Sequence, residues 1–339
     1  MTVRKVDVPT LILDTNVWTY IAKADEGDAL RALARGNDIE VVVPPSMLME
    51  ALKTRDLSIR RMIVRAMTAP GWTHPPTEAL QEAVEFVLEV RRCRPEWCRS
   101  HVNEDRVAAL SRFWTEKIWK AARRAPERWA EAHHSVENQA SQAVLDVQTH
   151  NRDALTGKQL EAGLLDRFVD TEDLPEAFRN AAPGTRAELW RFVNEQYYWT
   201  NLVHFLGRRR AGAVEDTSVL DWIEPYLDVD RISVDRESFI RFWLLEVARE
   251  NVPRNWMRWA VEHAQLRRKL ALSNGVDSQH TSYLFGIDYF ATADKRFIDA
   301  LDTVRRVSPR PFADTWRIIE QDGPIVPQLE RLLAARDPR

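Results

Sequence analysis

The stretch "VPTLILDTNVWTYIAKA", residues 8–24, decides the fold class. Leu11, Ile12 and Leu13 form a short apolar run typical of a buried strand, and Asp14 ends this run just before an amphipathic pattern. A carboxylate at the end of a buried strand is costly unless another group pairs with it. Asp14 is therefore the first candidate functional residue.

The next residues repeat the alternation of strand and helix. Residues 9–14 predict a strand, and residues 16–35 predict a helix with apolar positions along one face. "NDIEVVVPP" (37–45) predicts a second strand ended by two prolines, which cannot continue a ladder. Residues 46–67 predict a second helix, with Ser46 as its N-cap. This order is the start of a parallel α/β sheet.

The middle of the chain has a different character. "APGWTHPP" (69–76) is a junction rich in helix breakers, and the residues that follow, to about 265, show helical periodicity and no convincing strand. Ten of the 13 tryptophans lie between Trp97 and Trp259, enough aromatic material for a core in this segment. We therefore expect a mainly helical insertion.

Alternation of helix and strand returns near the end of the chain. We expect a helix over 277–287, a strand over 288–294 and a short helix over 295–301. Residues 304–312 predict a last edge strand, followed by a closing helix around "FADTWRIIEQD". The predicted division is therefore an α/β domain in two parts, residues 1–69 and 266–339, split by a helical insertion at 70–265.

Composition narrows the class of protein. With 45% hydrophobic and 29% charged residues, the chain of 339 residues is expected to be globular, not disordered. No apolar run approaches the roughly 18 residues that span a bilayer, and the N-terminus lacks the pattern of a signal peptide. Cys93 and Cys98 do not make a disulfide framework, so we expect a cytoplasmic protein without a membrane partner. The net charge of −3 means that any site for a polyanion must be a local patch.

Four acidic residues occupy comparable places in this predicted fold: Asp14, Glu50, Asp277 and Asp294. Two end strands and two lie near helix starts, so we expect them at the carboxyl edge of the sheet, where open parallel sheets bind ligands. Carboxylates that converge repel one another unless a cation is present. A hard divalent ion with oxygen ligands, Mg²⁺ or Mn²⁺, would resolve that repulsion.

The motifs that carry these acids are "LILDTNVW", "VVVPPSMLMEAL", "VDSQHTSYL" and "YFATADKRF". In this order they resemble the pattern of the PIN-domain nucleases. The resemblance covers about residues 9–69 and 270–320, and the long insertion departs from it. It implies a three-layer α/β/α domain whose acidic metal-binding and catalytic set is Asp14, Glu50, Asp277 and Asp294.

The resemblance also implies a function. It implies a metal-dependent endonuclease that hydrolyses phosphodiester bonds to a 5′-phosphate and a 3′-hydroxyl, with RNA favoured over DNA as substrate. Asn16 and Thr292 match the polar positions that support the acids in that family. A toxin-like or defence-related role would bring a restraining protein partner, for which the insertion is a candidate surface. Self-association of the chain stays open.

Basic clusters could line a path for the phosphates of a nucleic acid. They lie at residues 59–65, 208–210, 265–270 and 304–310. Helix ends and surface ion pairs are the simpler explanation, and for 208–210 that explanation is at least as good. We favour Arg267, Arg268 and Lys269 as substrate contacts because they directly precede Asp277.

Simpler interpretations stay open. Asp14, Asp277 and Asp294 could each cap a helix, Glu50 could be a solvated helix residue, and the whole chain could be an inactive scaffold whose insertion binds a protein or nucleic acid. The spacing of Cys93, Cys98 and His101 does not fit a zinc site. Arg258 and His263 are faintly similar to the Arg and His of the HEPN ribonucleases, a similarity that we interpret as chance.

Overall fold

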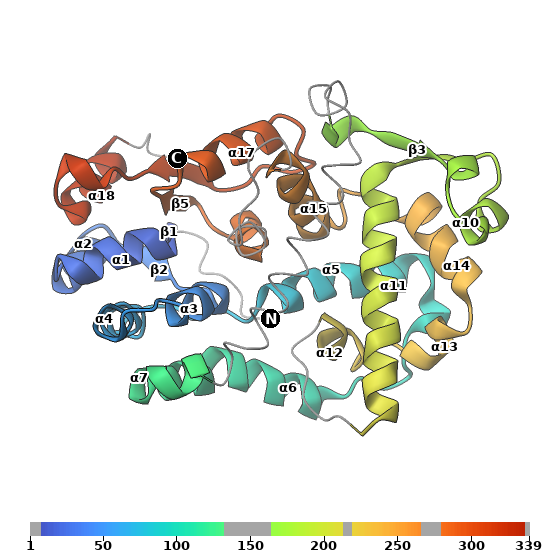
Figure 1. Cartoon of the computed structure of the whole chain (residues 1–339), viewed down its shortest axis with the longest axis horizontal. Coiled ribbons are helices and arrows are strands. Elements are labelled where there is room, and N and C mark those ends of the chain that lie inside the picture. Colours follow the sequence, from blue (N-terminus) through green and yellow to red (C-terminus); the bar gives the residue numbers. More distant parts are fainter. Residues whose placement is uncertain (1–7, 132–163, 213–218, 266–278, 336–339) are drawn as a thin grey trace.

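The computed structural model describes residues 8–131, 164–212, 219–265 and 279–335 (Figure 1). The main sheet consists of four parallel strands, β1 (Thr10–Leu13), β2 (Glu40–Val42), β5 (Tyr289–Thr292) and β6 (Asp314–Arg317). Their order in the sheet is β2-β1-β5-β6. Strands from the two ends of the chain therefore form one sheet, and the predicted mixed α/β fold with a parallel sheet is confirmed.

Strand β1 lies in the middle of this sheet. Ile12 is in register with Val42 of β2 on one side and with Phe290 of β5 on the other. All four residues of β1 are buried, which explains why its sequence is a continuous apolar run and not an alternating one. Asp14 directly follows the carboxyl end of β1 and is itself buried.

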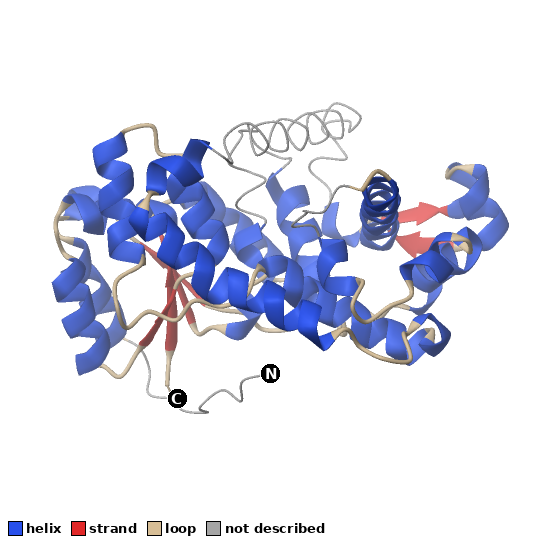
Figure 2. Ribbon diagram, turned by 90° about the horizontal axis from the view of Figure 1, so that it is seen from below, coloured by secondary structure: helices blue, strands red, loops and turns tan. Residues whose placement is uncertain are grey.

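Helices lie on both sides of the sheet (Figure 2), and they come from both ends of the chain. They are α1 (Thr15–Lys23), α2 (Gly27–Gly36), α3 (Pro45–Leu52), α4 (Leu57–Met67), α17 (Lys295–Arg305) and α18 (Ile325–Ala334). Helix α1 packs against α4, and α18 packs against α1 and α2. This arrangement leaves the carboxyl ends of β1 and β5 beside the start of α1.

Two predicted helices are each divided into two. The helix expected over 16–35 breaks at Asp25, which has a φ of 55° and cannot continue a right-handed helix. The helix expected over 46–67 breaks before Asp56, whose side chain accepts from the amide of Ile59 and begins α4. Ser46 is not the N-cap of α3, because Pro44 holds that position.

The segment between the two parts of the sheet is mainly helical. Its longer helices are α5 (Glu78–Cys93), α6 (Glu104–Arg112), α7 (Ile118–Arg124), α11 (Leu189–Arg210) and α15 (Pro253–Gln265). Its shorter helices are α10 (Glu176–Ala181), α12 (Val219–Ile223), α13 (Val229–Ser233) and α14 (Arg236–Arg241). The buried core continues from the sheet into α5, α11 and α15. In this core the ring of Tyr198 on α11 stacks on Phe86 of α5 and on Trp243, which follows α14. The boundaries at residues 69 and 265 stay predictions.

The expectation of no strand in this segment is wrong. β3 (Phe168–Asp170) and β4 (Arg186–Glu188) form a two-stranded antiparallel sheet, visible beside α10 in Figure 1. Each strand has only three residues, of which Ala187 alone is buried, so neither shows the apolar alternation that predicts a strand.

The end of the chain also differs from the prediction. Val304 belongs to α17, and Pro309 and Pro311 lack the amide hydrogen that a ladder requires, so residues 304–312 do not form the last strand. The last strand is β6, where Trp316 stacks on Tyr289 with ring centroids 4.3 Å apart. The predicted closing helix therefore lies later, at α18.

None of the helices in the described ranges combines the length and the apolar character that crossing a bilayer requires.

Candidate metal centre

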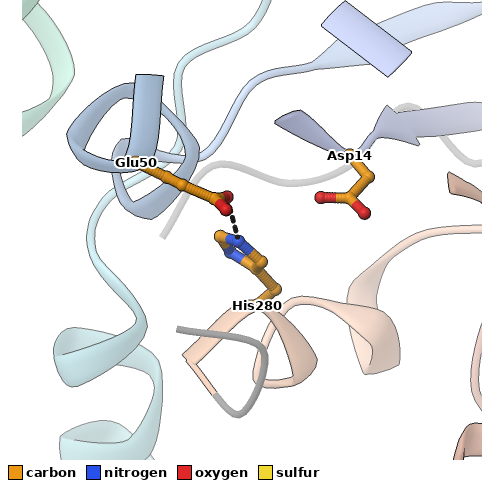
Figure 3. Close-up of side chains that lie close together, drawn as sticks. All are labelled: Asp14, Glu50 and His280. Carbon is orange, nitrogen blue, oxygen red and sulfur yellow. Dashed lines mark hydrogen bonds and ion pairs between the residues drawn. The ribbon is translucent and has the colours of Figure 1, made fainter. Parts of the chain in front are cut away.

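Three side chains from distant parts of the sequence meet at the carboxyl edge of the sheet (Figure 3). Asp14 follows β1 directly and caps α1, because its side chain accepts from the amide of Thr15. Glu50 lies in α3, the helix that begins after β2 ends at the same edge. His280 lies in a short helical turn that precedes β5. The parallel sheet thus brings His280 to Glu50, 230 positions away in the sequence, and to Asp14.

The three side chains offer ligand atoms that all lie within 4.8 Å of one another. His280 Nε2 lies 3.2 Å from Glu50 Oε2, and the other ring nitrogen, Nδ1, lies 2.9 Å from Ser46 Oγ. Asp14 and His280 are buried, whereas the side chain of Glu50 keeps 31% of its surface exposed. The group is therefore a largely buried carboxylate–imidazole cluster with one side open to solvent.

The carboxylate of Asp14 is held by neighbouring donors. Its Oδ1 accepts from the Thr15 amide at 2.7 Å. Its Oδ2 accepts from Asn16 Nδ2 at 2.6 Å and from Thr292 Oγ1 at 2.5 Å. Burial and the charge of Glu50 nevertheless raise the pKa of Asp14 from 3.8 to about 6, against the opposing effects of His280 and of these hydrogen bonds. The contacts within the protein therefore do not fully offset the cost of burying the ionised carboxylate.

Glu50 responds in the opposite direction to the same surroundings. Burial acts to raise the pKa of Glu50, but the hydrogen bond and the charge of His280, together with a hydrogen bond from Thr15 and the charge of Lys53, outweigh burial, so its pKa lies below the ordinary value. The two carboxylates therefore differ in kind. Glu50 has an imidazole as a hydrogen-bond partner, whereas the hydrogen bonds that Asp14 accepts come from the neutral donors Thr15, Asn16 and Thr292.

Asn16 and Thr292 connect the ends of β1 and β5. Asn16 Oδ1 accepts from the amide of Ala293 at 3.0 Å, while its Nδ2 donates to Asp14. Thr292 Oγ1 donates to Asp14 and accepts from the amide of Asp294 at 3.0 Å. Both predicted supporting residues thus contact the Asp14 carboxylate directly or through the backbone beside it.

Asp294 lies beside the cluster but is not one of its three members. Its Oδ1 accepts from the amides of Arg296 at 2.7 Å and Phe297 at 3.1 Å, which makes it the N-cap of α17. It does not belong to the group within 4.8 Å, and its connection to Asp14 runs through the hydroxyl of Thr292. Among the described acids, the structure therefore gathers Asp14 and Glu50 and leaves Asp294 at the next position along this edge.

Four predicted residues, Asp277, Arg267, Arg268 and Lys269, lie outside the described residues. His280, in contrast, belongs to the cluster and is not predicted from the sequence. Its signal in the sequence is its place three residues after Asp277 in "VDSQH", a spacing at which two residues of any helix share a face.

Buried polar contacts fix the segment that carries His280. Ser282 Oγ donates to Glu82 Oε1 of α5 at 2.7 Å, and Arg254 Nε of α15 donates to the carbonyl of Ser282 at 3.0 Å. Glu82 in turn accepts from Arg258 Nε at 3.0 Å. The helices of the middle segment therefore hold His280 against the sheet.

These contacts also account for the two residues that are similar to a HEPN pair. Arg258 is buried against Glu82 and Asn194, and His263 is buried with Nδ1 2.9 Å from the carbonyl of Trp259. Both side chains have partners inside the core. The free cysteines Cys93 and Cys98 are partly buried and are not part of the cluster.

The donor set fits a divalent cation. Two carboxylates and one imidazole supply hard oxygen ligands together with one nitrogen, a mixture that suits Mn²⁺ better than Mg²⁺. The hydrogen bond between Ser46 Oγ and Nδ1 would hold the ring with Nε2 directed at the carboxylates, as outer partners of metal-binding histidines do. A cation would also offset the cost of burying the Asp14 charge.

No protein-family model, no curated protein and no solved structure matches the chain.

Proposed function

We propose that the chain is a divalent-metal-dependent endonuclease that hydrolyses phosphodiester bonds, with RNA favoured over DNA. One observation carries the proposal: Asp14, Glu50 and His280 bring their ligand atoms within 4.8 Å at the carboxyl edge of a parallel sheet. That edge is where open α/β sheets bind ligands. The resemblance of the acidic motifs to those of the PIN-domain nucleases supports the same chemistry.

In this proposal the protein's residues have separate tasks. Asp14, Glu50 and His280 bind a Mn²⁺ or Mg²⁺ ion, which supplies Lewis acidity towards a phosphodiester. Asn16 and Thr292 orient the Asp14 carboxylate, and Ser46 orients the imidazole. Asp277 and Asp294 remain proposed ligands or proton acceptors from the resemblance. The toxin-like role and the restraining partner rest on the resemblance alone.

One observation favours a second candidate, an inactive scaffold whose helical segment binds a protein or a nucleic acid. The carboxylates already have protein partners, since His280 bonds to Glu50 and three donors bond to Asp14. A protonated imidazole between two carboxylates would balance charge without a metal. The two candidates therefore differ in whether a cation binds.

The test measures cation binding and cleavage on the full chain. Melting temperature is recorded against Mn²⁺ and Mg²⁺ concentration for wild type, for Asp14→Asn and for Asp302→Asn, an exposed acid on α17 that serves as the matched control. Cleavage of labelled RNA, single-stranded DNA and double-stranded DNA is followed with Mn²⁺ or with EDTA. A cation that binds only the folded chain stabilises it by about 2.7 kcal/mol at a hundred times its Kd.

We expect Mn²⁺ to raise the melting temperature of wild type and of Asp302→Asn, and to leave Asp14→Asn unchanged. Cleavage should require the metal and disappear in Asp14→Asn. Binding of the metal without cleavage of any polymer would overturn the nuclease assignment but keep the metal centre. If the metal causes no melting shift and no polymer is cleaved, the result favours the scaffold.

A further inference from the structure

A pocket of about 460 Å³ lies between α4 and α7, apart from the carboxylate–imidazole cluster. Arg61 and Arg65 of α4 and Arg123 and Arg124 of α7 line it, together with Glu127. Val64 and Pro126 supply a buried apolar floor. The volume falls in the range of about 300 to 1,000 Å³ that ligand sites usually have.

The charges of this arginine pocket are not balanced within it. Arg61 pairs with Glu127, and Arg123 donates to the backbone carbonyl of Thr68, so these two side chains are held in place. Arg65 and Arg124 are exposed and form no ion pair with any described residue. Four guanidinium groups around one carboxylate repel one another, and an anion in the pocket would relieve this repulsion.

Guanidinium groups select the anion by shape as well as by charge. Each presents planar, paired donors that match the oxygens of a phosphate, and it is more weakly hydrated than an ammonium group. None of the described residues that line this pocket is a lysine. The ligand that fits best is therefore a phosphate group, carried by a molecule large enough to extend from the pocket.

A simpler explanation covers part of this arrangement. Arg65 lies in the last turn of α4, and Arg123 and Arg124 lie in the last turn of α7, where cations favour the helix C-terminus. That effect explains a basic residue at each helix end. It does not explain why both ends direct their arginines into one pocket, with a fourth arginine one turn earlier on α4.

The segment after α4 connects the arginine pocket to the edge of the sheet that carries the cluster. Thr73 pairs with Val42 at the end of β2, and the next residue, His74, stacks on Trp119 of α7 with ring centroids 3.8 Å apart. The carbonyl that Arg123 contacts, at Thr68, belongs to the same segment. The segment 68–74 thus contacts the pocket at one end and the carboxyl end of β2 at the other.

We infer that the arginine pocket binds a backbone phosphate of the nucleic acid whose scissile bond lies at Asp14, Glu50 and His280. This inference rests on the proposed nuclease function and adds to it a second point of contact, which holds the strand away from the reacting bond. The contact is to the backbone, so it positions the polymer without reading its sequence.

The test measures binding in EDTA, so that it does not depend on metal or cleavage. Fluorescence anisotropy with a labelled single-stranded RNA oligonucleotide gives Kd for the full chain between 50 and 200 mM salt, a range over which phosphate contacts weaken markedly. The test variant is Arg65→Gln with Arg124→Gln. The matched control is Arg179→Gln with Arg331→Gln, two exposed arginines on α10 and α18.

We expect the test variant to bind RNA at least about tenfold more weakly, because two charge-assisted contacts are lost. The slope of log K against log salt should fall by about 1 to 2. The control variant should match wild type in both quantities, and the test variant should melt like wild type in EDTA.

Several outcomes would overturn the inference. One is that the test variant binds RNA with the Kd and salt slope of wild type, and another is that wild type binds no oligonucleotide in EDTA. If wild type binds inorganic phosphate or pyrophosphate in this pocket but does not bind RNA, the pocket belongs to a small phosphorylated molecule. Failure of the nuclease function shows separately, as a missing metal-dependent melting shift with RNA binding retained.

Discussion

The imidazole of His280 docks along one face of α3, with Nε2 3.2 Å from Glu50 Oε2 and Nδ1 2.9 Å from Ser46 Oγ. Ser46 and Glu50 are four residues apart in α3, so they lie one turn apart on the same side of the helix. One helix therefore fixes both nitrogens of the ring. This leaves the Nε2 edge beside the carboxylate of Glu50 and within reach of Asp14 (Figure 3).

Replacement of His280 by Gln should change which cation the site prefers. The variant exchanges a nitrogen ligand for an amide oxygen, which costs Mn²⁺ more than Mg²⁺ because imidazole suits the softer ion. We expect the apparent Kd for Mn²⁺, from melting temperature against metal concentration, to rise at least about tenfold with a smaller change for Mg²⁺. An equal change for both ions would show that His280 acts through structure and not as a ligand.

Replacement of Thr292 by Val should destabilise the fold through lost hydrogen bonds, with little change in volume. Thr292 is fully buried, donates to Asp14 Oδ2 at 2.5 Å and accepts from the amide of Asp294 at 3.0 Å. Loss of the hydroxyl leaves a buried carboxylate and an amide short of a partner, at a cost of about 1 to 3 kcal/mol. Urea unfolding measures the loss.

Two variants separate this effect from the effect of side-chain shape. Thr292→Ser keeps the hydroxyl and should retain most of the stability. Thr303→Val on α17 removes a partly buried hydroxyl that bonds only within its own helix, and it should cost about 0.5 kcal/mol or less. If Thr292→Val is no more costly than Thr303→Val, the contact with Asp14 contributes nothing to folding.

The buried ion pair of Glu82 and Arg258 should prove strongly coupled. Arg258 Nε lies 3.0 Å from Glu82 Oε2, and the side chains are 10% and 3% exposed. Arg258→Met leaves Glu82 charged and short of its partner, so we expect a loss of about 3 to 5 kcal/mol, part of which Glu82→Gln should restore in the double variant. The exposed pair Lys120–Glu116, 3.4 Å apart, is the control and should give less than about 1 kcal/mol.

The same cycle tests how His280 is positioned, since Glu82 also accepts from Ser282. A loss of Mn²⁺ affinity in Glu82→Gln that is absent in Lys120→Met would connect the core of the middle segment to the metal centre. Unchanged affinity would confine this ion pair to stability. The two readouts come from one set of melting curves.

The parts of the fold and site that could be predicted depend on local pattern. Leu11 to Leu13 form a buried central strand, whose apolar run is visible without any tertiary information, and Asp14 is the residue that directly follows it. Glu50 could be predicted from local pattern as well. Two prolines end the second strand, and the helical pattern that follows them carries Glu50. The order of strands and helices along the chain is therefore enough to place these two residues at one edge of the sheet.

What could not be predicted depends on contacts that are distant in sequence. Ser46 has the sequence of an N-cap, but its hydroxyl lies 2.9 Å from a ring nitrogen of His280, 234 positions away. Strands β3 and β4 pair through three residues each, too few to show a period. In each case tertiary contacts override the local pattern.

The buried imidazole of His263 predicts a specific dependence of stability on pH. Burial, with the charge of Arg167 acting in the same direction, lowers the pKa of His263 from 6.5 to about 4, although its hydrogen bond to the carbonyl of Trp259 opposes this shift. The unfolded chain binds a proton at this residue below about pH 6.5, whereas the folded chain resists protonation until about pH 4. The contribution is therefore complete above pH 6.5 and is lost as the pH falls towards 4.

The size of this contribution follows from the difference between the two pKa values. We expect up to about 3 kcal/mol of the free energy of unfolding to disappear over this interval because of His263. Urea unfolding at pH 7 and pH 4.5 gives the free energy of unfolding that each protein loses on acidification. This loss should be smaller in His263→Gln than in wild type. His204→Gln, an exposed position on α11, is the control and should keep the wild-type dependence. If His263→Gln loses as much stability on acidification as wild type, His263 is not what makes the fold sensitive to acid, and the other buried groups that titrate must account for that sensitivity.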